Sequence, residues 1–109
     1  TGQSIWRLEE AGNIYSTLPA KFATYTGELQ KVGYQTGYTG KGWSPGKLAP
    51  GGRKENPAGT LYAKRTLQPP FQAIRNTDYA GNFEDFLDTM GEDQPFCFWL
   101  GTSEPHRAF

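Results

Sequence analysis

The sequence predicts an α/β domain in which helices join parallel strands. Two observations lead to this prediction: a helix pattern is followed directly by a strand pattern at two places, and a long stretch rich in glycine and proline separates the two pairs. A helical connection between neighbouring strands favours a parallel arrangement. The predicted order is helix Thr24–Val32, strand Tyr34–Thr39, loop Gly40–Pro70, helix Thr77–Gly91 and strand Phe96–Leu100.

The first helix and its strand are recognised mainly by their ends. The hydroxyl of Thr24 can cap a helix start, and Gly33 is typical of a helix end. The segment 34–39 then alternates aromatic or small residues with polar ones, as a strand does. No period survives in the segment 40–70, which predicts a long loop, and loops of this length are usually functional or disordered.

The second helix shows the stronger pattern. Its apolar residues form the stripe of an amphipathic helix, and Asp78 is placed to cap it. The run 96–100 is continuously apolar, which predicts a strand covered on both faces, with Cys97 and Trp99 buried. The members of the helix stripe are Tyr79, Phe83, Phe86, Leu87 and Met90.

Composition limits the classes of function. At 109 residues the chain corresponds to about one small domain. Eleven basic and eleven acidic residues cancel, so nucleic-acid binding is not expected, and no segment predicts a membrane span. A single cysteine excludes an internal disulfide and a cysteine-based zinc site. The opening residues show neither an initiator Met nor a signal peptide, and we expect a front end that is missing from this sequence.

Both strands predict a site at one edge of the sheet. Ligands of parallel sheets bind beyond the carboxyl ends of the strands. The first strand leads directly to Lys41, and the second leads through a short loop to His106, the only histidine. We therefore expect one ammonium and one imidazole to share this edge.

Two stretches of the sequence carry a family resemblance. The stretches TGYTGKGW and PFCFWLGTSEPHRAF resemble two blocks of the sulfatase family, in the alkaline-phosphatase-like superfamily, and the likeness spans nearly the whole chain. The resemblance implies a three-layer α/β domain with a mostly parallel central sheet. It also implies that residues 1–109 are part of the catalytic domain, without the upstream Cys-x-Pro-Ser-Arg nucleophile block or the downstream metal ligands. A periplasmic or extracellular location would fit.

The same resemblance implies roles for individual residues. Lys41 matches a lysine that contacts the sulfate and the formylglycine, and His106 matches a histidine near the leaving oxygen. Trp43 is the candidate for contact with the rest of the substrate, a sulfated small molecule or glycan. Formylglycine and calcium are expected in the full-length enzyme, but no metal ligand is assigned in this chain. The acidic residues are interpreted as a helix face and a turn, and they are Asp78, Asp85, Asp88 and Asp93.

Some residues depart from the family pattern. Many sulfatases follow the lysine with Trp-His, whereas this chain has Gly42-Trp43-Ser44, so a second histidine contact is absent from the motif. Ala108 replaces a proline of the histidine block. Apart from the family pattern, Arg53 and Lys54 are interpreted as a solvated turn, although the same loop could face the substrate.

Two alternatives remain open. One is a phosphate or phosphonate hydrolase of the same superfamily, which would carry Thr or Ser in the upstream block. The other is a carbohydrate-binding module that uses Trp6, Trp43 and Trp99. The predicted burial of Trp99 disfavours the binding module.

Overall fold

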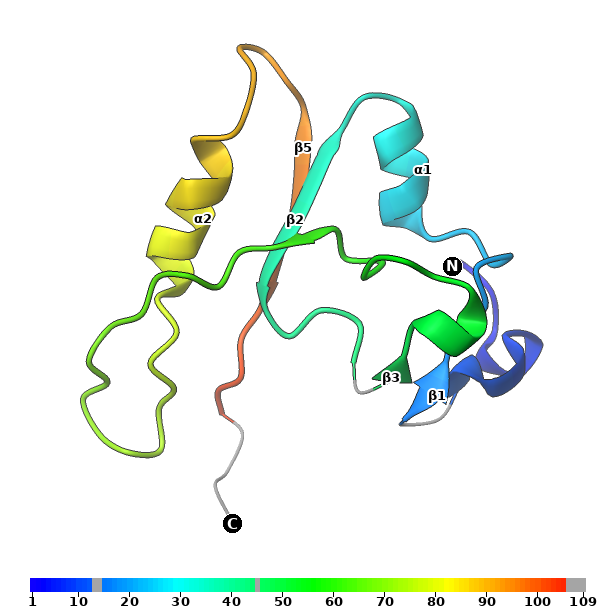
Figure 1. The fold of residues 1–109 in the computed structure, drawn as a ribbon, viewed down its shortest axis with the longest axis horizontal. Helices are drawn as coiled ribbons and strands as arrows, with labels where there is room; N and C mark the ends of the chain where they lie inside the picture. Colours follow the sequence, from blue (N-terminus) through cyan, green and yellow to red (C-terminus); the bar gives the residue numbers. More distant parts are fainter. Residues whose placement is uncertain (13–14, 45, 106–109) are drawn as a thin grey trace.

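The computed structural model describes residues 1–12, 15–44 and 46–105 and confirms the predicted order of the main elements (Figure 1). Each of the two longer helices leads into a strand of six residues, in the pairs α1 Tyr25–Lys31 with β2 Gln35–Gly40, and α2 Tyr79–Leu87 with β5 Phe96–Gly101. The shorter elements are η1 Ile5–Arg7, η2 Glu9–Gly12, β1 Ser16–Thr17, β3 Gly46–Lys47, η3 Ala49–Gly51 and β4 Thr60–Leu61.

The predicted helix caps are present. The side chain of Thr24 accepts a hydrogen bond from the Gly27 amide at the start of α1. The carboxylate of Asp78 accepts one from the Gly81 amide at the start of α2. Both bonds satisfy amides that a helix start leaves without intrahelical partners.

The main sheet has three parallel strands in the order β4-β2-β5. In the β2–β5 pair, Gln35 lies opposite Phe96 and Gly40 lies opposite Gly101, so both strands end at the same level. A second, smaller parallel pair is formed by β1 and β3. The predicted α/β class with parallel strands is therefore confirmed.

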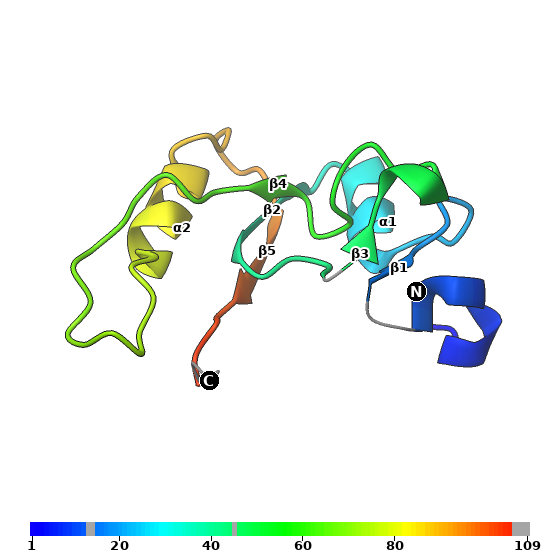
Figure 2. The ribbon, with the colours of Figure 1, turned by 60° about the horizontal axis from the view of Figure 1, so that its bottom comes forward.

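The helices α1 and α2 lie on opposite faces of the main sheet. Gln30 of α1 donates a hydrogen bond to the hydroxyl of Thr36 at 2.6 Å. The next residue, Gly37, faces α2, because a Cβ there would lie 2.8 Å from the ring of Phe86. Successive residues of a strand point to opposite faces, and both views place α1 and α2 on either side of β2 and β5 (Figures 1 and 2).

An aromatic cluster holds α2 against the sheet. Phe86 is fully buried, and its ring centroid lies 4.8 Å from that of Phe98 and 5.4 Å from that of Tyr62. Phe83 lies 4.8 Å from Phe98, centroid to centroid, and Phe96 lies 5.6 Å from Phe86. The apolar stripe predicted for this helix therefore packs on the sheet, although Leu87 is exposed.

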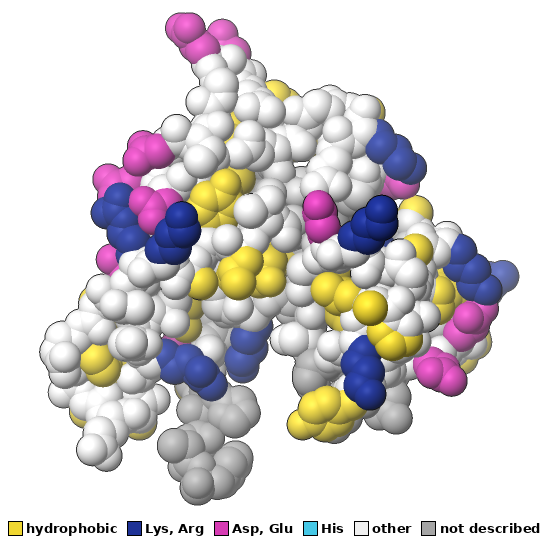
Figure 3. All heavy atoms as spheres, in the orientation of Figure 1, with side chains coloured by type: hydrophobic (Ala, Val, Ile, Leu, Met, Phe, Trp, Pro, Cys, Tyr) yellow, Lys and Arg dark blue, Asp and Glu magenta, His cyan; other side chains and the backbone are white. Residues whose placement is uncertain are grey.

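Two expectations about the strands are wrong. The predicted loop 40–70 contains β4, the third strand of the sheet, which sequence periodicity misses because it is two residues long. Leu61 of this strand is exposed. Figure 3 shows hydrophobic side chains at the surface across the middle of the face that Figure 1 views. The strand β5 is not covered on both faces, because it lies at the sheet edge, and Trp99 and Leu100 are 48% and 58% exposed.

No helix in the described parts of the chain is long and apolar enough to cross a membrane.

Candidate functional site

Hydrogen bonds continue to connect the chain after β2 to β5 past Gly40 and Gly101, the last paired residues of the two strands. The amide of Lys41 donates to the carbonyl of Gly101 at 2.7 Å, and the indole Nε1 of Trp99 donates to the carbonyl of Lys41 at 2.8 Å. A Cβ at Gly101 would overlap the carbonyl of Lys41, so this approach requires glycine. We call residues 40–44 and 101–105 the strand-end site.

The side chain of Lys41 is exposed, while its backbone N–H and C=O are both hydrogen-bonded to β5. No ion pair of its ammonium occurs within the parts of the chain that the structure describes. The predicted position of Lys41 at the carboxyl edge of the sheet is confirmed. An anion that reaches this edge would therefore meet a cation with a fixed backbone.

The loop after β5 is anchored to the start of α2. The amide of Ser103 donates to the hydroxyl oxygen of Tyr79 at 2.9 Å, and this hydroxyl donates to the Glu104 carboxylate at 2.8 Å. The amide of Arg75 donates to the other carboxylate oxygen at 2.9 Å. These bonds, that from Arg75 first and that from Tyr79 second, lower the pKa of Glu104 below its ordinary value. His106 follows this loop and lies outside the described residues.

The backbone of Trp43 is held by the side chain of Asn56. The amide of Trp43 donates to Oδ1 of Asn56 at 3.0 Å, and Nδ2 of Asn56 donates to the carbonyl of Trp43 at 3.1 Å. The amide of Ala58 also donates to Oδ1, at 2.9 Å. The Trp43 indole packs against Gly46 of β3. Sequence reasoning missed Asn56, because the Asn-Pro pair indicates a turn but not its partner 13 residues away.

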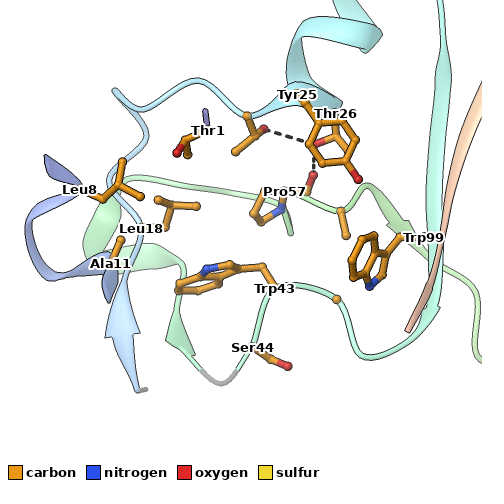
Figure 4. A pocket seen from close by; sticks show the side chains of 13 residues that line it. Thr1, Leu8, Ala11, Leu18, Tyr25, Thr26, Trp43, Ser44, Pro57 and Trp99 are labelled. Atoms are coloured by element: carbon orange, nitrogen blue, oxygen red, sulfur yellow. Dashed lines mark hydrogen bonds between the residues drawn. The ribbon is translucent and has the colours of Figure 1, made fainter. Parts of the chain in front are cut away.

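An open cavity of about 410 Å³ lies beside the strand-end site (Figure 4). Tyr25, Trp43 and Trp99 contribute aromatic rings from three segments of the chain, and hydroxyl groups come from neighbouring threonine and serine residues. None of the described residues that line the cavity has a charged side chain, which favours an uncharged, partly apolar occupant. Its lining residues are Thr1, Leu8, Ala11, Leu18, Thr24, Tyr25, Thr26, Gly42, Trp43, Ser44, Pro57, Ala58 and Trp99.

The interpretation of Arg53 as part of a solvated turn is wrong. Its guanidinium donates to the carbonyls of Leu18 at 2.8 Å, Pro19 at 3.2 Å and Phe22 at 2.5 Å. Loss of solvent lowers the pKa of Arg53. Arginine can bind several carbonyls at once because its planar head carries five donors, so Arg53 joins η3 to the segment before α1.

Two of the four acidic residues singled out in the sequence, Asp78 and Asp85, have structural partners for their side chains. Asp78 caps α2, and the Asp85 carboxylate pairs with the guanidinium of Arg65 at 2.7 Å. Among residues 1–12, 15–44 and 46–105, no three His, Cys, Asp or Glu side chains are grouped so that they could hold a metal ion.

The single cysteine, Cys97, is the second residue of β5. Cys97 is a free, partly buried thiol, so the expectation of full burial is wrong. Burial, and then the neighbouring Cys97 thiol, raise the pKa of the Tyr25 phenol above its ordinary value.

The strand-end site thus combines an exposed lysine, an anchored loop that precedes the only histidine, and an aromatic cavity at its side. No protein-family model matches the chain, and neither a curated protein nor a solved structure matches it.

Proposed function

We propose that the chain belongs to the catalytic domain of a sulfatase with an alkaline-phosphatase-like fold, which hydrolyses sulfate esters of small molecules or carbohydrates. The observation that supports this most is the meeting of two parallel strand ends, which brings Lys41 beside the loop that leads to His106. Sequence resemblance supplies the family, and the geometry supplies a plausible place for an anion.

In this proposal Lys41 stabilises the sulfuryl group. The non-bridging oxygens of a sulfate ester carry negative charge through the transition state, and a fixed ammonium lowers the energy of that charge. The backbone bonds of Lys41 to Gly101 and Trp99 keep the base of the side chain in place. The reaction then requires little reorganisation of this residue.

His106 would protonate the leaving oxygen. An alkoxide is a poor leaving group, so an imidazolium within reach accelerates its departure. An adjacent sulfate favours the protonated form of histidine. The described part of the preceding loop is fixed through Tyr79 and Arg75, which supports a defined position for the residues that follow.

Formylglycine and calcium belong to the proposal only through the resemblance. The described residues do not supply a calcium site, and Cys97 lies mid-strand outside any Cys-x-Pro-Ser-Arg motif. Neither group therefore fits the described residues, and the role proposed for this chain is limited to Lys41, His106 and the substrate surface. The proposal predicts that the gene encodes Cys-x-Pro-Ser-Arg shortly before the codon for Thr1.

Kinetics of the full-length protein test both residue roles. Lys41→Ala should lower kcat/KM by about 10²–10³ on alkyl and nitrophenyl sulfates alike, because both contain the sulfuryl group. His106→Ala should lower kcat on alkyl sulfates by about 10²–10⁴. Nitrophenyl sulfate should lose much less, because its leaving group needs little protonation.

Lys47→Ala is the matched control, since Lys47 is an exposed lysine in β3. Equal losses of His106→Ala on both substrates would remove the acid role. Activity on phosphate esters but not on sulfate esters would favour the superfamily alternative.

A carbohydrate-binding module is the second candidate, and one observation favours it. Trp99, expected to be buried, is half-exposed and lines the cavity together with Trp43. Aromatic faces commonly pack against ligand surfaces in such pockets. Titration of the Lys41→Ala variant with neutral and sulfated glycans separates the two candidate functions. A binding module would bind the neutral and the sulfated glycan equally, whereas a sulfatase site would lose affinity for the sulfated glycan.

A further inference from the structure

We infer that Asn56 is a positioning residue for the strand-end site, acting through the backbone of Trp43 on the placement of Lys41. The inference rests on the proposed function for its catalytic consequence. Its structural basis is independent, because one amide side chain satisfies both the N–H and the C=O of Trp43. Such a two-point contact fixes the orientation of a loop as well as its distance.

Asn56 is itself held in place by the rest of the fold. The hydroxyl of Thr26, a buried residue of α1, donates to the carbonyl of Pro57, as Figure 4 shows. The amide of Ala58 closes a turn onto Oδ1 of Asn56, and the amide of Gly59 donates to its carbonyl at 2.9 Å. The Asn56 turn is therefore anchored to α1, and position 43 is fixed relative to that helix.

Lys41 is then constrained from two directions. Its own amide and carbonyl are held by Gly101 and Trp99 of β5, and the chain two residues later is held by Asn56. The only residue between the two anchor points is Gly42. Glycine has more backbone conformations available than any other residue, so without both anchors this position would be flexible. Loss of the Asn56 bonds would leave the Lys41 backbone fixed on the β5 side alone.

The chain provides a matched control for this arrangement. Asn82 of α2 holds the backbone of Arg65 in the same way, with Oδ1 accepting at 3.0 Å and Nδ2 donating at 3.0 Å. Asn82 is fully buried and belongs to the α2 side of the fold. Its removal should reduce stability but leave the Trp43 backbone in place, because the side-chain bonds of Asn82 reach Arg65 and Asp78 and not the Asn56 turn.

The test compares Asn56→Ala with Asn82→Ala in the full-length protein labelled with 5-fluorotryptophan. Asn56→Ala should shift or broaden the fluorine resonance of Trp43, identified by its loss in Trp43→Phe, and should lower kcat/KM on nitrophenyl sulfate by about 10². Asn82→Ala should leave the Trp43 resonance unchanged. Asn56→Asp, which keeps the acceptor for the two amides, should show a smaller shift and provides a second variant if Asn56→Ala does not fold.

An unmoved Trp43 resonance in both Asn56 variants would overturn the inference. The inference would also be overturned if Lys41→Ala inactivates the enzyme while Asn56→Ala leaves kcat/KM unchanged. If neither Lys41→Ala nor Asn56→Ala affects sulfate-ester hydrolysis, the proposed function fails instead, and the Trp43 resonance alone decides whether Asn56 positions the loop.

Discussion

The two sides of the molecule are held together by different kinds of contact. On the α2 side, aromatic rings pack between the helix and the sheet, with Phe86 fully buried at their centre. On the other side, the main contacts are polar side chains bound to backbone groups of distant segments, as Arg53 is to three carbonyls and Asn56 is to Trp43. The α2 side also has one such contact, between Asn82 and the Arg65 backbone, in addition to its aromatic packing. The strand-end site lies where these two sides meet.

This difference indicates how each side would respond to change. Apolar packing is non-directional and depends on volume, so removing a buried side chain leaves a cavity and lowers the free energy of unfolding. Hydrogen bonds to backbone groups are directional, so their loss frees one particular segment. We therefore expect α2-side substitutions to act mainly through lost packing, substitutions at Arg53 to free the segment 18–22, and substitutions at Asn56 to free the loop that carries Lys41 and Trp43.

The largest expected effect belongs to Phe86→Ala. The ring is completely buried among Tyr62, Phe83 and Phe98, so truncation removes its contacts and leaves a cavity. The free energy of unfolding should fall by about 3–5 kcal/mol, measured by urea denaturation. Phe71→Ala is the control because Phe71 is 60% exposed. Similar losses for both variants would show that the cluster is not the core of this side.

Arg53→Ala should give the next largest effect. Three carbonyls of the segment 18–22 lose their donor, and hydrogen bonds to a charged group are worth about 1.5–3 kcal/mol. Because Arg53 is partly exposed, the expected loss of unfolding free energy is about 1.5 kcal/mol, the lower end of this range. The adjacent exposed Lys54 provides the control, with an expected change within about 0.5 kcal/mol. A loss no greater than that of Lys54→Ala would contradict the role assigned to Arg53.

The α2 side was the more predictable one. The stripe of the second helix, its capping residue Asp78 and the parallel strand pair follow from periodicity and local chemistry, which a sequence displays directly. On the opposite face, the cap of α1 at Thr24 was predictable for the same reason. The position of Lys41 follows because a parallel pair places both carboxyl ends together. These features depend on residues that are close in sequence or on a general rule of topology.

The other side depends on pairings that no local pattern encodes. The bonds of Arg53 to Leu18 and of Asn56 to Trp43 connect residues 35 and 13 positions apart, and no local pattern pairs these residues. The strand β4 is too short to show alternation. Trp99 was expected to be buried because a run of apolar residues reports hydrophobicity, not the strand's place at the sheet edge.

Thr39→Val tests the centre of the sheet with a smaller expected effect. Thr39 is fully buried in β2, and its hydroxyl has no hydrogen-bond partner among the residues that the structure describes. Replacing an unsatisfied hydroxyl by a methyl group should raise the unfolding free energy by about 1 kcal/mol. Thr36→Val should lower it, because the Thr36 hydroxyl accepts from Gln30 at 2.6 Å. A loss of stability in Thr39→Val would mean that its hydroxyl is bonded in solution.

The smallest expected effect concerns Glu104 and the acid side of the pH range. Because the bonds from Arg75 and Tyr79 favour the carboxylate, the pKa of Glu104 is lower in the folded protein than its ordinary value of 4.5. The unfolded chain therefore binds this proton first as the pH falls, and the stabilisation is complete above pH 4.5 and is lost below it, through the folded pKa. Glu104→Gln should be less stable than the wild type at pH 7, with a difference that shrinks as the pH falls below 4.5, measured by urea denaturation at each pH. Glu55→Gln, at an exposed loop position, controls for the removal of one charge. A difference between wild type and Glu104→Gln that stays constant from pH 7 to pH 3 would show that the carboxylate does not anchor the loop before His106.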